Sequence, residues 1–205
     1  MPDLEATRLS LHAVAEMLLA GPQYDASRTI KLRVTPGGFG TVAAPSARVE
    51  GTTLRIGERR PLALDGRAIS AVAVEAGLPA RPLADLYSGG PGLTVDHALT
   101  IDGAAAAEIA EGFRVGAEAL AAFAPDTEAV LWPEHFDLGI SLDEVNYGVS
   151  PGDSFLGVPY AYVGPWSPAD VSGSFWNAPF GAAHPLHEIP DLGGFFAEGR
   201  AVTAR

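Results

Sequence analysis

Residues 30–64 read IKLRVTPGGFGTVAAPSARVEGTTLRIGERRPLAL, and this stretch decides the fold class. It contains four short runs of the residues that strands prefer, at Ile30–Thr35, Ala47–Glu50, Thr53–Ile56 and Pro61–Leu64. Turns rich in glycine and proline separate these runs. Consecutive strands joined by short turns predict an antiparallel meander rather than a sheet whose strands alternate with helices.

Helices are expected on both sides of this meander. The segment Leu4–Ala20 carries one apolar stripe, and Gly21-Pro22 is expected to end its helix. Aspartates are the expected N-caps of three further helices, namely Asp65 before Gly66–Ala76, Asp102 before Ala104–Phe123, and Asp191 before a helix at the C-terminal end.

The last third of the chain returns to strands. These are expected at Ala129–Trp132, Asp137–Leu142, Val158–Gly164 and Gly173–Trp176. The sequence therefore predicts an α+β fold, in which mainly antiparallel sheet packs with about four helices in a single compact domain of residues 1–205. Because the order helix, strands, helix occurs twice, two similar halves at about 1–100 and 101–205 stay open as an alternative.

The composition excludes several kinds of site and cellular location. The chain has 205 residues, 47% of them hydrophobic, and contains no cysteine, which excludes disulfides, thiolate catalysis and thiolate metal sites. Charged residues interrupt the first twenty positions, so neither a signal peptide nor a membrane span is expected. We therefore expect a soluble, cytoplasmic protein.

The net charge of −12 is concentrated in the second half of the chain. Residues 115–205 contain twelve acidic residues but only two basic ones, Arg200 and Arg205. Binding to nucleic acid or to an anionic membrane needs clustered cations, so neither partner is expected. The carboxylates of this half are expected to be solvated at the surface or to face a cation.

The distinctive chemistry lies between Trp132 and Gly181, where all three tryptophans and three of the five tyrosines occur. Many of these rings are expected in the core, because aromatic side chains bury large areas. The alternative is a cleft with aromatic and acidic walls for a small neutral or cationic molecule. The candidate ligand-binding residues are Trp132, Glu134, His135, Asp137, Asn146, Tyr147, Asp153, Tyr160, Tyr162, Trp176 and Asn177.

A histidine and an aspartate two residues apart suggest a second chemistry. In an extended segment His135 and Asp137 would share one face, either as a base with its orienting carboxylate or as two metal ligands. A third ligand, His184 or alternatively His187, would complete a site for a divalent zinc, iron or manganese ion. A metal-dependent hydrolase or isomerase is therefore an alternative function, although no established ligand spacing is present.

One catalytic pattern matches by accident. Gly148–Gly152 fits the G-x-S-x-G nucleophile elbow around Ser150. The residue after that serine must donate a backbone N–H to the oxyanion, and here it is Pro151, which has none. We therefore do not assign a serine nucleophile.

Several motifs together resemble a family of uncharacterised bacterial proteins, a domain of unknown function. They are WPEHFDL at 132–138, NYG at 146–148 with SPGD at 150–153, PYAYV at 159–163 and FWN at 175–177. The resemblance implies a soluble bacterial protein and supplies no activity.

The best interpretation of the sequence is a small-molecule-binding protein with an aromatic, acidic pocket formed by residues 132–180. Whether the protein is an enzyme stays open. Trp166 lies between two prolines in a loop, so a third alternative is a protein-interaction module or a homo-oligomer that uses this ring.

Overall fold

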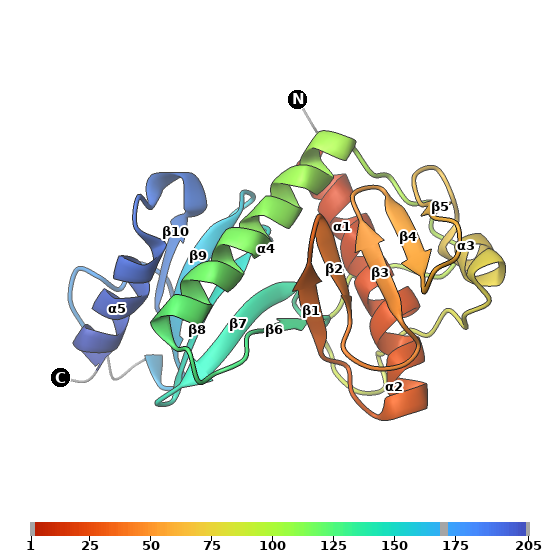
Figure 1. Cartoon of the computed structure of the whole chain (residues 1–205). Coiled ribbons are helices and arrows are strands. Elements are labelled where there is room, and N and C mark those ends of the chain that lie inside the picture. Colours follow the sequence, from red (N-terminus) through yellow and green to blue (C-terminus); the bar gives the residue numbers. More distant parts are fainter. Residues whose placement is uncertain (1–2, 169–171, 204–205) are drawn as a thin grey trace. The chain divides into compact units, whose positions relative to one another are not determined.

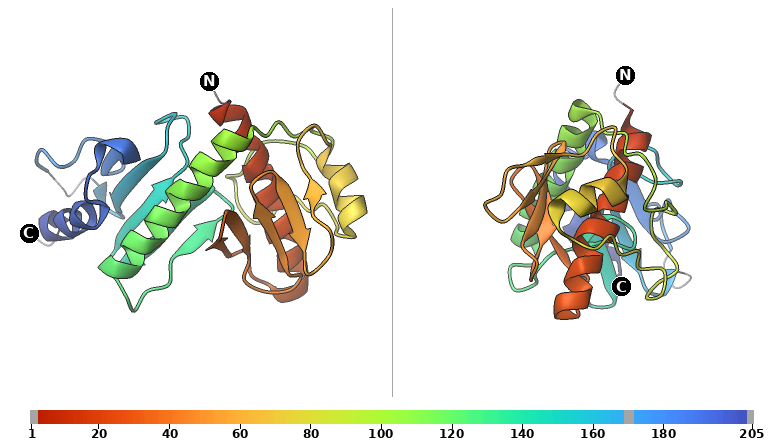
Figure 2. Two further views of the ribbon diagram at one scale, coloured as in Figure 1. Left: turned by 45° about the horizontal axis from the view of Figure 1, so that its top comes forward. Right: turned by 90° about the vertical axis from the view of Figure 1, so that its right-hand side faces the viewer.

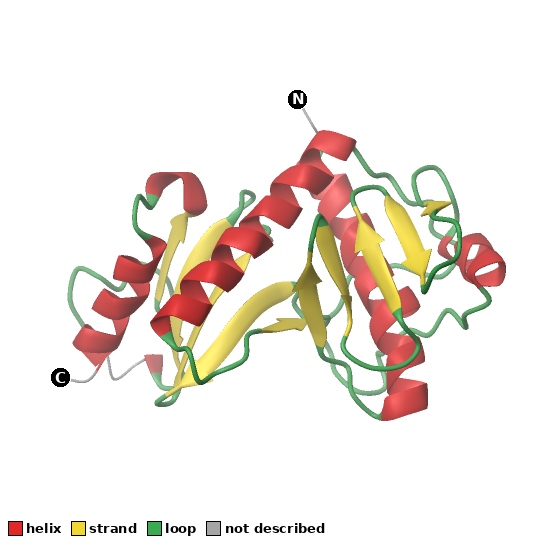
Figure 3. Ribbon diagram, viewed as in Figure 1, coloured by secondary structure: helices red, strands yellow, loops and turns green. Residues whose placement is uncertain are grey.

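The computed structural model describes residues 3–168 and 172–203, and it confirms the α+β class (Figures 1 and 3). The strand pairs with a defined register are all antiparallel. The chain divides into two compact units. Unit 1 comprises residues 1–111 and 131–136, and unit 2 comprises residues 112–130 and 137–205.

Unit 1 contains the antiparallel meander expected from residues 30–64, but it has an additional strand at Gly38–Thr41, where the glycines predict a turn. Its strand order is β6–β1–β2–β3–β4–β5, with bounds Val130–Trp132, Leu32–Thr35, Gly38–Thr41, Ala47–Glu50, Thr53–Ile56 and Leu62–Ala63. A long helix contacts β1 and β2 (Figure 2). This helix has three consecutive parts, α1 (Leu4–Val14), the π-helical η1 (Ala15–Ala20) and α2 (Gly21–Ser27). A short helix, α3, spans Ile69–Ala76.

The long helix continues past the position where the sequence predicts its end. Gly21 and Pro22 lie inside it, so the expectation that Gly21-Pro22 ends the helix is wrong. The Gly21 N–H donates to the Glu16 carbonyl, five residues back, which is a π-helical bond. This wider turn precedes Pro22, which lacks an N–H and takes one of the first positions of α2.

Unit 2 contains the strands in the order β7–β8–β9–β10, which span Asp137–Leu142, Val145–Ser150, Tyr160–Pro165 and Ala182–Pro185. Helix α4 (Gly103–Phe123) begins in unit 1 and enters unit 2 at Gly112. Unit 2 also contains the short 3-10 helix η3 (Leu186–Glu188) and the last helix, α5 (Leu192–Thr203).

Helices α4 and α5 cover one face of this four-stranded sheet. A β-carbon at Gly116 of α4 would collide with the Val149 side chain of β8, and one at Gly199 of α5 would lie 2.8 Å from the Val163 side chain of β9. Glycine therefore allows each helix to pack closely on a valine. Tyr147 points to this covered face and packs against Phe123 and Phe196.

Some element predictions are wrong for identifiable reasons. Gly173–Trp176 is a turn rather than a strand, because Gly173 has φ +121° and accepts the Trp176 N–H. Asp65 accepts the Ile101 N–H instead of capping a helix. By contrast, Asp102 caps α4 through the N–H groups of Ala104 and Ala105, as expected. No helix in residues 3–168 and 172–203 is long and apolar enough to cross a membrane.

Candidate functional site

The face of the unit 2 sheet opposite Tyr147 gathers polar side chains, and we call it the polar face. In antiparallel sheets, directly opposed residues share a face and alternate residues share it along each strand. Ser141 opposes Asn146, which opposes Gly164, while Gly139 opposes Gly148, which opposes Tyr162. The polar face consists of Asp137, Gly139, Ser141, Asn146, Gly148, Ser150, Tyr160, Tyr162 and Gly164.

Tyr162 lies across a floor of two glycines and reaches a carboxylate. A β-carbon at Gly139 would lie 2.8 Å from the Tyr162 hydroxyl oxygen, and one at Gly148 would lie 2.5 Å from it. Without those β-carbons the phenol rests on the backbone and donates a hydrogen bond to Asp137 Oδ2. Burial, reinforced by the Asp137 charge, raises the pKa of Tyr162 well above its ordinary value.

A second tyrosine pairs with a second aspartate beside the first pair. The Tyr160 hydroxyl donates to Asp153 Oδ2 at 2.7 Å. The other oxygen of Asp153 accepts the N–H groups of Phe155 at 2.7 Å and Leu156 at 3.1 Å, which fixes the loop after β8. Burial and the hydrogen bond to Asp153 raise the pKa of Tyr160. Both phenols therefore stay protonated at neutral pH and act as hydrogen-bond donors.

The two tyrosines belong to a continuous row of four aromatic rings. The ring centroids of Phe180 and Phe155 are 5.0 Å apart, those of Phe155 and Tyr160 are 6.4 Å apart, and those of Tyr160 and Tyr162 are 6.4 Å apart. Phe155 is 46% exposed, so part of the row is open to solvent. We call these four rings the aromatic row.

Trp166 is held beside the polar face although it is 62% exposed. Its indole N–H donates to Asn146 Oδ1 at 3.2 Å, and the Ser141 hydroxyl donates to the same oxygen at 2.7 Å. The backbone N–H of Trp166 donates to the Glu144 carbonyl at 2.9 Å. The ring is therefore oriented before any ligand binds.

The structure brings five of the predicted ligand-binding residues together in unit 2. They are Asp137, Asn146, Asp153, Tyr160 and Tyr162. Tyr147 lies elsewhere, because its side chain is fully buried under the helices. Trp176 packs edge-on against Phe175, and Asn177 exchanges two hydrogen bonds with the backbone of Ala183 in β10.

The other three predicted residues belong to unit 1. Residues 133–136 form a turn in which Phe136 has φ +54° and donates its N–H to the Trp132 carbonyl at 2.8 Å. The extended segment that would place His135 and Asp137 on one face is therefore absent, and that expectation is wrong. His135 is exposed and lies 4.0 Å from Glu134 Oε1, and Lys31 Nζ lies 6.0 Å from the Trp132 ring.

The expected metal ligands are divided between the two units, because His135 belongs to unit 1, and Asp137 and His184 belong to unit 2. Within the described ranges, 3–168 and 172–203, no three His, Asp or Glu side chains gather as a metal site requires. His184 instead packs its ring edge against Phe195 and has Nε2 3.4 Å from Asn177 Nδ2. The nucleophile-elbow pattern is accidental in the structure too, because Ser150 ends β8 and a loop follows it.

Unit 1 holds a titratable pair that the sequence interpretation missed. His12 Nε2 lies 2.7 Å from the Pro133 carbonyl oxygen. Since a carbonyl can only accept, Nε2 carries the hydrogen and Nδ1 keeps its lone pair. The imidazole stacks on the Phe136 ring with a centroid distance of 5.4 Å. Burial is the largest cause that lowers the pKa of His12 from 6.5 to about 4.

One turn further along the helix, Glu16 is buried with 4% exposure. Its carboxylate accepts the Leu83 N–H at 3.3 Å and the Tyr87 hydroxyl at 3.0 Å, and burial raises its pKa. A signal for this pair is present in the sequence, since two ionisable residues four apart interrupt the otherwise apolar run at residues 11–20. Nothing local identifies Tyr87 as a partner, because it lies 71 residues away.

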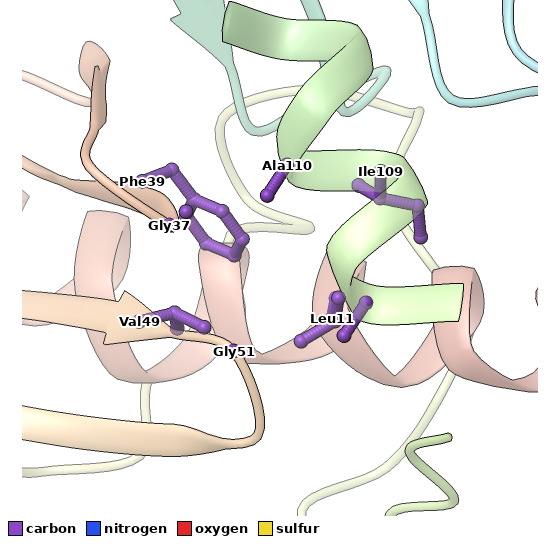
Figure 4. A pocket seen from close by; sticks show the side chains of 9 residues that line it. Leu11, Gly37, Phe39, Val49, Gly51, Ile109 and Ala110 are labelled. Carbon is purple, nitrogen blue, oxygen red and sulfur yellow. The ribbon is translucent and has the colours of Figure 1, made fainter. Parts of the chain in front are cut away.

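Unit 1 also has an apolar depression, shown in Figure 4. Leu11, Phe39, Val49, Ile109 and Ala110 line it together with Gly37 and Gly51. It is too narrow to hold a water molecule and presents no polar side chain. It is therefore a packing defect of the core rather than a ligand site.

Comparisons with known proteins do not assign the chain to a family. No family model, no curated protein and no solved structure matches it.

Proposed function

We propose that unit 2 binds a small organic cation, such as a protonated amine, at the aromatic row and the adjoining polar face. The single observation that carries this proposal is the row of four rings whose two phenols each donate to an aspartate. Aromatic faces attract cations, and carboxylates beside them add a direct charge interaction. The sequence resemblance and the absence of cysteine favour a bacterial, cytoplasmic protein for this role.

The charge around the row supports a cationic ligand over an anionic one. The sequence has no lysine or arginine between Val115 and Gly199. Arg200, the next basic residue, donates to Asp143 Oδ2 at 2.8 Å. Among residues 3–168 and 172–203, the groups that donate to Asp153 are neutral, namely one hydroxyl and two backbone N–H groups. Its negative charge is therefore available to raise the local concentration of a cation.

The state of the two phenols supports binding rather than catalysis. A tyrosine that acts as a base or nucleophile needs a lowered pKa. Tyr160 and Tyr162 have raised pKa values, so each one donates a hydrogen bond and holds an aspartate in place. Their role is to position carboxylates beside a ring surface.

The proposal is tested by titrating the protein with choline and with 3,3-dimethyl-1-butanol, a neutral molecule of nearly the same shape. NMR shifts of the Phe155, Tyr160 and Trp166 side chains report binding. We expect choline to shift them and the neutral molecule to bind at least about tenfold more weakly, which corresponds to about 1.4 kcal/mol. Equal binding of both molecules, or no shift with choline and a panel of primary amines, would contradict the proposal.

A matched pair of charge variants locates the site. Asp153→Asn removes one charge at the aromatic row, whereas Asp126→Asn removes one charge from an exposed position of unit 2 outside it. We expect the first variant to weaken choline binding about fivefold or more and the second to change it less than twofold. Equal losses in the two variants would mean that only the overall charge matters.

A further inference from the structure

A segment without helix or strand, Leu83–Gly90, lies against the long helix of unit 1, and we call it the strap. Two of its groups bind Glu16, because the Leu83 N–H and the Tyr87 hydroxyl donate to the two carboxylate oxygens. A third group, the Gly90 N–H, donates to the Glu134 carbonyl at 2.9 Å. The hydrogen bonds from the strap to the helix therefore end on a single carboxyl group.

The strap contacts that carboxyl group through its backbone as well. Gly90 has φ +109°, and a β-carbon there would lie 2.5 Å from Glu16 Oε2. At the preceding residue, Gly89, a β-carbon would lie 2.7 Å from Cγ of Glu134. Two consecutive glycines thus let the main chain close over both glutamates, an approach that a larger residue would prevent.

The environment under the strap favours the neutral form of Glu16. The carboxyl group is 4% exposed, and the two groups that bind it are a backbone amide and a phenol, neither of which carries a positive charge. An ionised carboxylate loses much of its hydration when it is buried with neutral donors alone. It regains that hydration if the strap moves away.

We propose that the strap is a proton-controlled cover, which stays closed while Glu16 is protonated and opens when Glu16 ionises. Opening exposes the Glu16 carboxyl group. The strap thereby keeps this carboxyl group out of water at low pH and admits water to it as the pH rises.

The other charged groups around Glu16 do not reverse the expected pH dependence, in which the strap opens as pH rises. From the same helix, His12 is neutral above about pH 4, because burial and, to a smaller extent, the charge of Arg8 lower its pKa. From the strap, Tyr87 stays neutral because burial and Glu16 raise its pKa, while Asp85 is bound by Arg81 at 2.9 Å. From the turn, Glu134 lies against Gly89 of the strap. His135 Nε2 lies 4.0 Å from Glu134 Oε1, so His135 is replaced in the test.

The experiment measures amide hydrogen exchange of Leu83 and Gly90 by NMR between about pH 4 and pH 8, each rate divided by the intrinsic rate of that amide. We expect the protection of both amides to fall as pH rises from about 4.5 to the raised pKa of Glu16, by up to about tenfold per pH unit, and then to level off. The Leu64 amide, which donates to Thr52 outside the strap, should be more protected at every pH.

Variants distinguish opening of the strap from a general loss of stability in unit 1. Glu16→Gln mimics the protonated form, so its strap amides should stay protected with no dependence on pH. Tyr87→Phe removes one of the two bonds and should lower protection about tenfold at every pH, whereas the control Tyr24→Phe, on α2, should change nothing. His135→Gln should keep the wild-type dependence. A flat profile in the wild type, or a dependence that persists in Glu16→Gln, would overturn the proposal.

If Glu16→Gln does not fold, the titration of the Glu16 side-chain carboxyl carbon in the wild type decides. The proposal requires a midpoint above the ordinary glutamate value, at the pH where the protection of the strap amides levels off. A midpoint at the ordinary value, or one that does not coincide with the change in protection, would also overturn it.

Discussion

The phenol ring of Tyr162 lies directly over Gly148 on the neighbouring strand, so closely that a β-carbon at Gly148 would lie 2.6 Å from Cζ of the ring. The same contact carries the Tyr162 hydroxyl across the sheet to Asp137. The absence of β-carbons at Gly148 and Gly139 therefore leaves the space in which the Tyr162 phenol reaches Asp137. The residues on either side of Gly148 in the strand, Tyr147 and Val149, point to the opposite face, where their side chains fill the space under the helices.

Gly148→Ala should collide with the Leu138 carbonyl oxygen of β7, displace the Tyr162 ring and break its hydrogen bond to Asp137. The added methyl group has no free space, so we expect a loss of about 2–3 kcal/mol in the free energy of unfolding, measured by urea denaturation. Gly157→Ala is the matched control, because nothing lies within 4 Å of its β-carbon position, and it should change stability by less than about 0.5 kcal/mol. Equal effects of the two substitutions would show that neither the contact with Tyr162 nor that with Leu138 limits the space at Gly148.

The hairpin between β7 and β8 predicts a stabilising substitution. Asp143 and Glu144 form its turn with φ +53° and +62°, a left-handed conformation that side chains other than glycine and asparagine disfavour. Glu144→Gly should therefore raise the unfolding free energy by about 0.5–1 kcal/mol, measured by thermal and urea denaturation. Because Trp166 binds the backbone carbonyl of Glu144, its position should not change. A decrease in stability would mean that the Glu144 side chain makes a favourable contact of its own.

Local signals predicted much of the fold. Asp102 marks the start of a helix, and the apolar stripe of Ala104–Phe123 has the helical period. Helix α4 confirms both predictions. Strand β8 was missed because Asn146 and Gly148 are residues typical of loops, and only pairing with β7 and β9 makes the segment a strand. Propensity carries no information about that pairing.

The candidate sites, like the fold, could be predicted from the sequence only in part. Aromatic and acidic residues of the segment 132–180 were recognisable by type, yet the face on which each lies depends on strand register, which separates Tyr147 from Tyr160 and Tyr162. The pair of Glu16 and Tyr87 was not predictable, because it depends on a π-helical turn and on a loop far away in the sequence.

Glu16→Gln should stabilise unit 1 at neutral and alkaline pH. A carboxyl group whose pKa is raised in the folded state binds more protons when folded, so stability is lost as pH rises from about 4.5 through the raised value. Glutamine has nearly the same shape and never ionises. We expect the variant to gain of the order of 1 kcal/mol over the wild type at about pH 8 and much less at about pH 4.5, by urea denaturation. A gain that is the same at both pH values would rule out ionisation as its cause.

His12 should give the opposite pH dependence. Its pKa falls from 6.5 in the unfolded chain to about 4 in the folded protein, so the unfolded chain binds more protons between these values. Stability contributed by the neutral imidazole is therefore complete above about pH 6.5 and is lost as pH falls to about 4, with a total of about 3 kcal/mol. His12→Gln keeps a side-chain N–H that can donate to the Pro133 carbonyl and cannot titrate. The slope of unfolding free energy against pH in this window should therefore decrease in the variant, whereas His187→Gln, at an exposed histidine, should leave it unchanged. If the slope of the wild type survives in His12→Gln, the acid sensitivity arises elsewhere, and the buried tautomer at His12 contributes nothing to it.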